Sequence, residues 1–184
     1  LTQKEFESIY LGTRVPKSDV QVEDGFVSVG DIDWVAQGAV TPIKDQGQCG
    51  SCWAFSTTGG LEGLSKLGFN QLQSFSEQQL VDCSELYGNH ACSGGLMDNA
   101  YRYVKAKGIT TEDKYPYHAV KKACEVQSGE FHIGGHVDAS GCTNLANALT
   151  GRPISVAVDA RNWSPYKTGV FNNCGTTLDH GVLL

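Results

Sequence analysis

The chain has 184 residues, of which 40% are hydrophobic and 18% charged, and its formal net charge is −6. This length suits one compact domain, or two small ones that share a core, without help from a metal. The acidic balance, with no run of lysine or arginine, argues against a nucleic-acid or anionic-membrane surface. No apolar stretch reaches the roughly 18 residues that a membrane span needs.

The N-terminal residues, up to about residue 27, differ from the rest because they contain no cysteine and no clear hydrophobic period. The pattern from Thr2 to Glu5 is that of a helix cap followed by one short helical turn. The chain begins with Leu1 rather than methionine, which is typical of a processed or partial sequence. We therefore interpret this region as an extension or linker.

The first two thirds of the chain are predicted to be mainly helical. Apolar residues recur at helical spacing from Gly50 to about Gly68 and predict a buried helix. Each internal glycine costs about 1 kcal/mol of helix propensity, so we expect another element to pack closely there. A capping box at Ser76 begins a second helix, and a third runs from about Leu96 to a C-cap at Gly108.

The last third is predicted to be richer in strands. Residues 131–137 form a candidate strand, and residues 143–150 a short helix closed by Gly151. Apolar and small or polar residues alternate from Ile154 to Asp159, which predicts a strand with one apolar face. Another strand begins at Val182. Chemistry is expected at the junction of the helical and β-rich parts.

The most specific segment contains two cysteines three residues apart, Cys49 and Cys52. A redox pair lacks the βαβ context that it would need, and a zinc site lacks a second close-spaced pair. The remaining interpretation is a nucleophile. Cys52 would lie in the first turn of the buried helix, where free N–H groups and the helix dipole favour a thiolate. The side-chain amide of Gln46 and the backbone N–H of Cys52 would then stabilise an oxyanion.

Cys49-Gly50-Ser51-Cys52-Trp53 matches the local signature of the papain and cathepsin cysteine proteases. The chain resembles this papain family from about Trp34 to Leu184, and its sequence in the matching blocks is most similar to the cathepsin L-like branch. The resemblance extends over six blocks in family order: Gly38–Pro42, Gln46–Phe55, Leu80–Ser84, Cys92–Ala100, Pro153–Asp159 and Leu178–Val182.

This resemblance implies an α+β, papain-like fold with two lobes. The helical lobe would span about residues 39–136. The β-rich, barrel-like lobe would combine residues 28–38 with 137–184 and would be incomplete. Residues 1–27 would be the C-terminal part of a propeptide that inhibits its own enzyme, and residues 28–184 the peptidase domain.

The nucleophile requires a histidine, and residue type alone does not choose among the five in the chain: His90, His118, His132, His136 and His180. The resemblance selects His180 as the partner of Cys52 and Gln46 as the oxyanion donor. The activity implied is endopeptidase cleavage through a thioester, without metal or cofactor. The family orients its histidine with a later asparagine. The sequence ends before that block, so we expect this chain to cleave poorly or not at all.

The resemblance also implies disulfides between Cys49 and Cys92 and between Cys83 and Cys124, and hence a lysosomal, vacuolar or secreted location. Cys174 either bonds Cys142 or pairs beyond the chain, which would leave Cys142 as a buried thiol. The implied substrate contacts are Gly94, Gly95, Leu96, Met97, Ala157, Asp179 and Gly181. Four of them, Leu96, Met97, Ala157 and Gly181, match positions that line the family's main specificity pocket, and they imply a preference for a bulky apolar side chain one residue before the scissile one.

Two alternatives to an active peptidase stay open at this point. One is a catalytically inactive papain-like protein that binds peptides, and the other is a thiol oxidoreductase that uses Cys49 and Cys52. The expected partners of the peptidase are peptide or protein substrates and its own propeptide, and the protein would be a monomer. Asn162 begins an N-glycosylation sequon.

Overall fold

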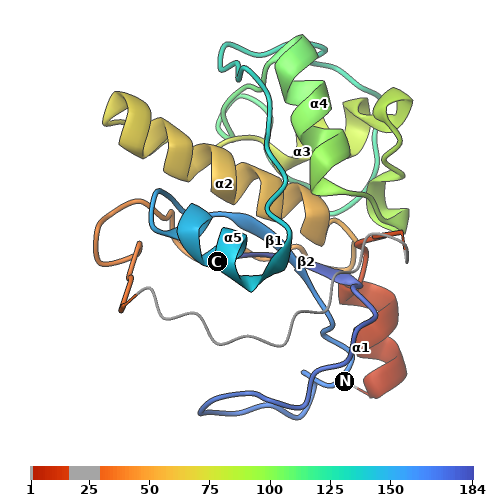
Figure 1. The fold of residues 1–184 in the computed structure, drawn as a ribbon. Coiled ribbons are helices and arrows are strands. Elements are labelled where there is room, and N and C mark those ends of the chain that lie inside the picture. The colour runs from red at the N-terminus through yellow and green to blue at the C-terminus, as the bar shows by residue number, and fades with distance from the viewer. Residues whose placement is uncertain (1, 17–29) are drawn as a thin grey trace.

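The computed structural model describes residues 2–16 and 30–184. Helices and strands follow in the order α1 (Gln3–Tyr10), α2 (Cys52–Phe69), α3 (Glu77–Cys83), η2 (Glu85–Tyr87), η3 (Ala91–Ser93), α4 (Met97–Lys107), α5 (Gly141–Leu149), β1 (Ser155–Val158) and β2 (His180–Leu183). Figure 1 shows α2, α3 and α4 together in one part of the molecule, with the two strands and α5 on the other side of α2. This arrangement confirms the predicted α+β fold, with a helical part and a small β part.

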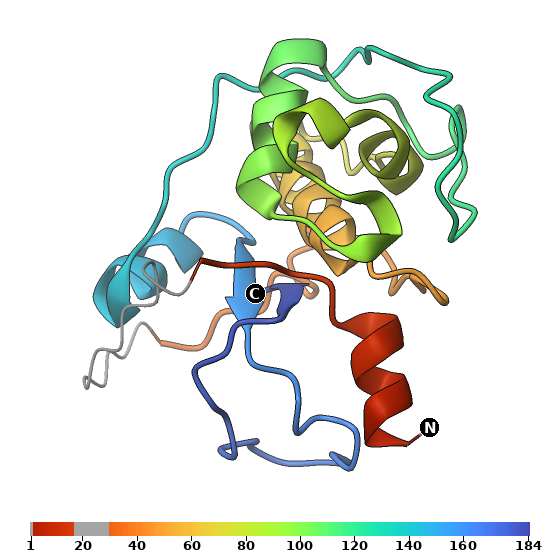
Figure 2. The same cartoon turned by 90° about the vertical axis from the view of Figure 1, so that its right-hand side faces the viewer.

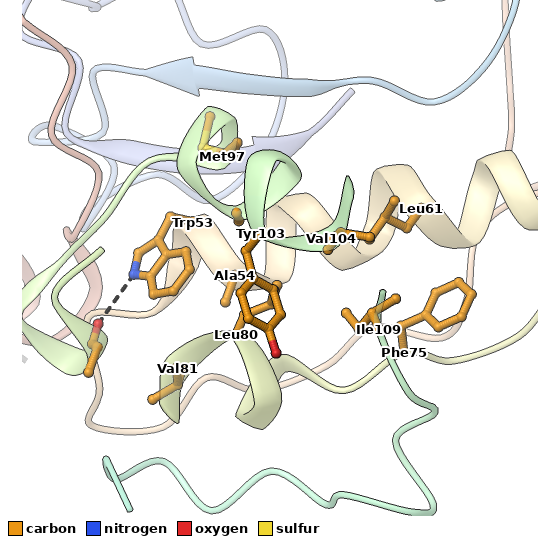
Figure 3. Packing of buried hydrophobic residues seen from close by; sticks show 12 residues of the cluster. Trp53, Ala54, Leu61, Phe75, Leu80, Val81, Met97, Tyr103, Val104 and Ile109 are labelled. Atoms are coloured by element: carbon orange, nitrogen blue, oxygen red, sulfur yellow. Dashed lines mark hydrogen bonds between the residues drawn. The ribbon is translucent and has the colours of Figure 1, made fainter. Parts of the chain in front are cut away.

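The long helix α2 is the element shared by both parts. Its apolar residues Trp53 and Leu61 are fully buried, and they join a core built with Tyr103 and Val104 of α4 (Figure 3). On its other side the backbone approaches the β part closely. A Cβ on Gly63 would lie 2.9 Å from the Pro153 ring. The glycines that weaken helix propensity therefore permit the close packing that the sequence predicts.

The two strands form an antiparallel pair that rests on α2. Ala157 lies opposite Gly181, and Val158 lies opposite His180. The Ser56 hydroxyl of α2 donates a hydrogen bond to the Val182 carbonyl at 2.7 Å. The strand pairing and the hydrogen bond to α2 together fix the position of His180 relative to the helix.

The predicted strand over residues 131–137 is wrong. Phe131 makes only an isolated bridge with Ile109, and the residues after it have no regular structure. Gly134 and Gly135 follow closely, and Gly135 has a φ of +150°. Because neighbouring glycines have no side chains to pack on a sheet, the segment runs on as a connection toward the β part.

The N-terminal region has more structure than the sequence predicts. The capping box at Thr2 forms as expected, but it begins a full helix, α1, rather than one turn. The predicted boundary between residues 27 and 28 lies outside the described residues. Among the helices that the structure describes, none is long and apolar enough to cross a membrane.

Candidate active site

Cys52 is the first residue of α2, and its side chain is buried, with 1% exposed. The loop before it is tied down by the disulfide between Cys49 and Cys92, whose sulfurs are 2.07 Å apart. The Gly50 N–H also donates to the Cys92 carbonyl at 3.0 Å. The free N–H groups and positive dipole end of α2 therefore act on a sulfur atom whose position is fixed.

His180 is the first residue of β2, and its side chain lies beside the Cys52 thiol. Burial by itself raises the pKa of the Cys52 thiol, yet hydrogen bonding and charge attraction from His180 bring that pKa below its usual value. Thr13 and the backbone of Gly181 lower the pKa further. The structure thus brings together the two side chains that the resemblance selects, although 127 intervening positions offer no local signal for that meeting.

The imidazole of His180 is held from two sides. Its Nδ1 atom lies 3.1 Å from the Tyr10 carbonyl oxygen, and the Trp163 ring packs edge-on against it with ring centres 5.8 Å apart. Sequence reasoning did not single out either neighbour. The contact with Trp163 joins positions far apart in sequence, and no short-range pattern predicts it.

Gln46 shares the Tyr10 carbonyl with His180. The Gln46 amide nitrogen donates to this oxygen at 3.3 Å and to the Cys49 carbonyl at 2.9 Å. A peptide carbonyl therefore lies between the histidine ring and the predicted oxyanion donor.

Tyr10 is the last residue of α1, and residues 11–16 continue from it into the site in extended form. Thr13 forms a parallel bridge with Gly95, with the Gly95 N–H donating to the Gly12 carbonyl at 2.8 Å. The Thr13 hydroxyl lies 3.4 Å from the Cys52 sulfur. Figure 2 shows the segment after α1 passing between the helical part and the strands. The interpretation as a simple linker missed this placement, because backbone pairing with a distant loop leaves no periodicity in the sequence.

The predicted substrate-contact residues surround this segment. A Cβ on Gly95 would lie 2.8 Å from the Trp53 ring, so a side chain at this position would clash with that ring. Across the segment, Gly181 faces both Thr13 and Met97, because a Cβ on Gly181 would lie 3.1 Å from the Met97 sulfur. Gly94 adjoins Gly12, Leu96 is half-buried at the N-cap of α4, and Ala157 packs against the core cluster.

Asp179 contributes its backbone and its carboxylate to different tasks. Its carbonyl accepts the Thr13 N–H at 3.0 Å, while its carboxylate accepts the Ala160 N–H at 3.0 Å. The Arg161 guanidinium lies between this carboxylate, at 3.7 Å, and that of Asp159, at 2.6 Å. Burial is the main cause that raises the pKa of Asp179. The salt bridge between Arg161 and Asp159, which the sequence did not predict, stabilises the loop beside His180.

An aromatic cavity of about 390 Å³ adjoins the histidine. It is lined by residues of α1, of the loop before Cys52 and of the β part: Phe6, Tyr10, Gln46, Trp163, Tyr166, Phe171 and His180. Because α1 supplies two of its walls, the space beside His180 would widen if α1 moved away.

The cysteine pairing argues against one alternative, the thiol oxidoreductase that would use Cys49 and Cys52. Both disulfides that the resemblance implies are present, and Cys52, Cys142 and Cys174 form no disulfide. The expectation that Cys142 is a buried thiol is wrong, because Cys142 is exposed, and it does not bond Cys174. A Cys49–Cys52 redox pair is not formed, since Cys49 bonds Cys92.

One group of three side chains in the described residues could hold a metal ion. The side chains there that come close enough to share an ion are Asp98, His136 and Asp138, whose ligand atoms all lie within 4.8 Å of one another. Both carboxylates are exposed, and none of the three side chains is among the groups that shift the pKa of Cys52. The cluster therefore takes no part in activating the thiol.

The site thus consists of a buried thiol beside a histidine, with peptide backbone laid across it. The sequence model of the papain family cysteine proteases matches residues 29–184, and the chain therefore belongs to that family.

Relatives and solved structures agree with this assignment. Cathepsin L 2 of Paramecium tetraurelia is 40% identical over 191 residues, which cover 100% of this chain and 61% of that protein. Vignain of Ricinus communis is 41% identical over 204 residues, which cover 100% of this chain and 56% of that protein. The structure of digestive procathepsin L 3 from the larval midgut of Tenebrio molitor matches with a TM-score of 0.83 and 36% identity, covering 100% of this chain and 62% of the other. The chain thus spans about three fifths of the length of these relatives.

Proposed function

We propose that this protein is a cysteine endopeptidase, made as a zymogen, in which Cys52 and His180 form a thiolate–imidazolium pair. The observation that carries the proposal is the lowered pKa of Cys52 beside His180, with a peptide carbonyl held next to both His180 and Gln46. A thiolate at a helix N-terminus beside an imidazolium is reactive at a pH where a free thiol is not.

The residues would act in two steps. The Cys52 thiolate attacks the scissile carbonyl carbon, and the Gln46 amide and the Cys52 N–H stabilise the oxyanion. The C–N bond then breaks as His180 gives its proton to the leaving amine, and a thioester remains on Cys52. A water molecule next loses a proton to His180 and attacks the thioester, which releases the acid and regenerates the thiolate.

Residues 2–16 would act as the inhibitory propeptide in this scheme. Their backbone hydrogen bonds with Gly95 and Asp179 are those that an extended substrate would make, and Thr13 covers the Cys52 sulfur. A chain laid across the site in this way blocks substrate without offering a bond in position for attack. Removal of this segment would expose the site and free the aromatic cavity beside His180.

Substrate selection would rest on the surfaces around Thr13. Gly94 and Gly95 would pair with substrate backbone, while Leu96, Met97, Ala157, Asp179 and Gly181 would surround its side chains. Leu96, Met97, Ala157 and Gly181 are small or apolar, which favours a bulky apolar side chain one residue before the scissile one. The two disulfides support a lysosomal, vacuolar or secreted location.

The test compares the three thiols that form no disulfide, after proteolytic removal of residues 2–16, because Thr13 covers the Cys52 sulfur in the intact chain. Iodoacetamide at about pH 6 should label Cys52 in preference to Cys142 and Cys174, although those two are exposed, because His180 lowers the pKa of the Cys52 thiol. His180→Ala should abolish that preference, and Cys52→Ser should abolish cleavage of a fluorogenic peptide with an apolar residue before the scissile one. Labelling of Cys52 only at alkaline pH, with peptide binding retained, would favour the inactive peptide-binding alternative.

A further inference from the structure

A second cavity, of about 550 Å³, lies apart from the active site, between the loop before α2 and the start of α3. Its rim is apolar: Pro42, Ile43, Phe55 and Leu72 line it, and the Ile43 side chain is fully exposed. Its floor is polar and is formed by Lys44, Asp45, Glu77, Glu112 and Tyr117 together with Thr41 and Ser74. The proposed peptidase mechanism uses none of these residues.

Carboxyl groups outnumber cations at this floor. The ammonium group at this floor is that of Lys44. Its nitrogen lies 2.6 Å from a carboxylate oxygen of Glu62 and 2.7 Å from one of Glu77. Both of these glutamates are almost completely buried. Glu77 also accepts the Thr58 hydroxyl at 2.6 Å. Two buried carboxylates thus share one lysine, and Glu112 adds a third carboxyl group beside them.

Among the side chains that line this cavity, Glu112 has a buried carboxylate oxygen without a hydrogen-bond donor. Its Oε1 atom accepts the Tyr117 N–H at 2.7 Å, but its Oε2 atom is buried and no donor in the described part of the chain reaches it. Burial, then the negative charge of Glu77 and a hydrogen bond that the protonated Glu112 shares with Glu77, raise the pKa of Glu112 to about 7, against the opposing effect of the Tyr117 N–H. A buried carboxylate oxygen without a donor is costly, so it must hold a proton or meet a cation.

We propose that this cavity binds a primary ammonium group on an apolar stem, the chemistry of a lysine side chain of another polypeptide segment. The ammonium would lie between Glu77 and Glu112, and the stem would pack on Ile43, Phe55 and Leu72. A bare metal ion fits less well, because the carboxylates here do not form a group close enough to share one among the described residues. It would also leave the apolar rim without a function.

The cavity is connected to the nucleophile loop. The Tyr117 hydroxyl donates to the Gln46 carbonyl at 2.8 Å and lies 2.6 Å from the Ser51 hydroxyl. Tyr117 also carries the N–H that holds Glu112. An occupant that fixes Glu112 would therefore also steady the residues directly before Cys52.

The test is an NMR titration of the whole chain with hexylammonium chloride at about pH 8, with hexanol as the neutral probe of similar shape. Hexylammonium should shift resonances of residues that line the cavity, and hexanol should not. Glu112→Gln should weaken binding about tenfold, the loss expected for one charge-assisted hydrogen bond. Glu85→Gln removes the same charge from an exposed carboxylate that pairs with Lys121, and it should leave binding unchanged.

A pH series on the unaltered chain supplies a second readout that does not depend on how the variant folds. Cation binding must release the proton of Glu112, so affinity should fall as pH drops from about 8 to about 5. Lys44, Asp45, Glu62, Glu77 and Tyr117 face the same space and contribute to that profile. Equal binding of hexanol, affinity independent of pH, or the absence of cavity shifts would each overturn the proposal. None of these results depends on Cys52, so they leave the proposed peptidase function standing.

Discussion

The helical and β parts of this molecule hold the two reactive side chains in different ways. Every residue of the core cluster lies between Trp53 and Ile109, and both disulfides tie loops of the same region. The β part has two strands of four residues each, with side chains such as Val137 and Val170 almost fully exposed. Cys52 therefore lies on a helix that is packed into the core and flanked by disulfides, whereas His180 lies on a small two-stranded sheet that packs against α2.

The largest expected difference between the parts appears on truncating one tryptophan in each. Trp53→Ala should lower the free energy of unfolding by about 3–5 kcal/mol, because a fully buried aromatic ring is lost from the core. Trp163→Ala, in the β part, should cost far less, since Trp163 is only partly buried. Urea denaturation followed by circular dichroism measures both. Equal losses would show that the β part has a core of comparable strength.

Disulfide removal sharpens the same comparison. Serine at both Cys83 and Cys124 should cost about 3–4 kcal/mol in the chain-entropy model, because the bond closes a loop with a sequence separation of 41 residues. Serine at both Cys142 and Cys174, which form no disulfide in the structure, is the control and should change stability little. A large loss in the control would mean that these two cysteines bond each other in solution.

The pH dependence of stability should originate in the helical part, at Glu112. The pKa of Glu112 in the folded protein is raised to about 7 from 4.5, so the folded state holds its proton more tightly than the unfolded state. This contribution is complete below about pH 4.5 and is lost as pH rises toward 7 and above. After allowance for solvent screening, the loss should be about 1–2 kcal/mol.

Glu112→Gln checks this assignment, because it should flatten the stability profile between about pH 4.5 and 8. The matched variant Glu85→Gln should retain the slope. Thermal denaturation midpoints across that range are the measurement. An unchanged slope in Glu112→Gln would place the titrating group elsewhere.

The smallest effect concerns the contact between the two parts. Ser56→Ala removes the hydrogen bond to the Val182 carbonyl and should cost about 1 kcal/mol of stability. Because β2 carries His180, we also expect the pKa of Cys52 to rise toward its usual value. The rate of iodoacetamide labelling against pH reports that pKa. Ser8→Ala, at an exposed position of α1, serves as the control and should leave the profile unmoved.

The amino-acid sequence by itself determined the local features. Helix α2 begins where the cysteine signature predicts, the cap at Ser76 begins α3, and Gly108 ends α4. Such signals involve residues within about one helical turn, where backbone geometry and side-chain caps decide the outcome. The family resemblance, rather than any spacing rule, selected His180 from five histidines and implied both disulfides.

Only the tertiary structure decided which distant segments meet. It laid residues 11–16 across Cys52, set Trp163 against His180 and left Glu112 with a buried oxygen that no described donor reaches. It also denied residues 131–137 a strand partner beyond the single bridge at Phe131. A strand or a cleft contact gains its stability from backbone groups far away in sequence, and an alternation of apolar residues carries no record of which partner is in reach.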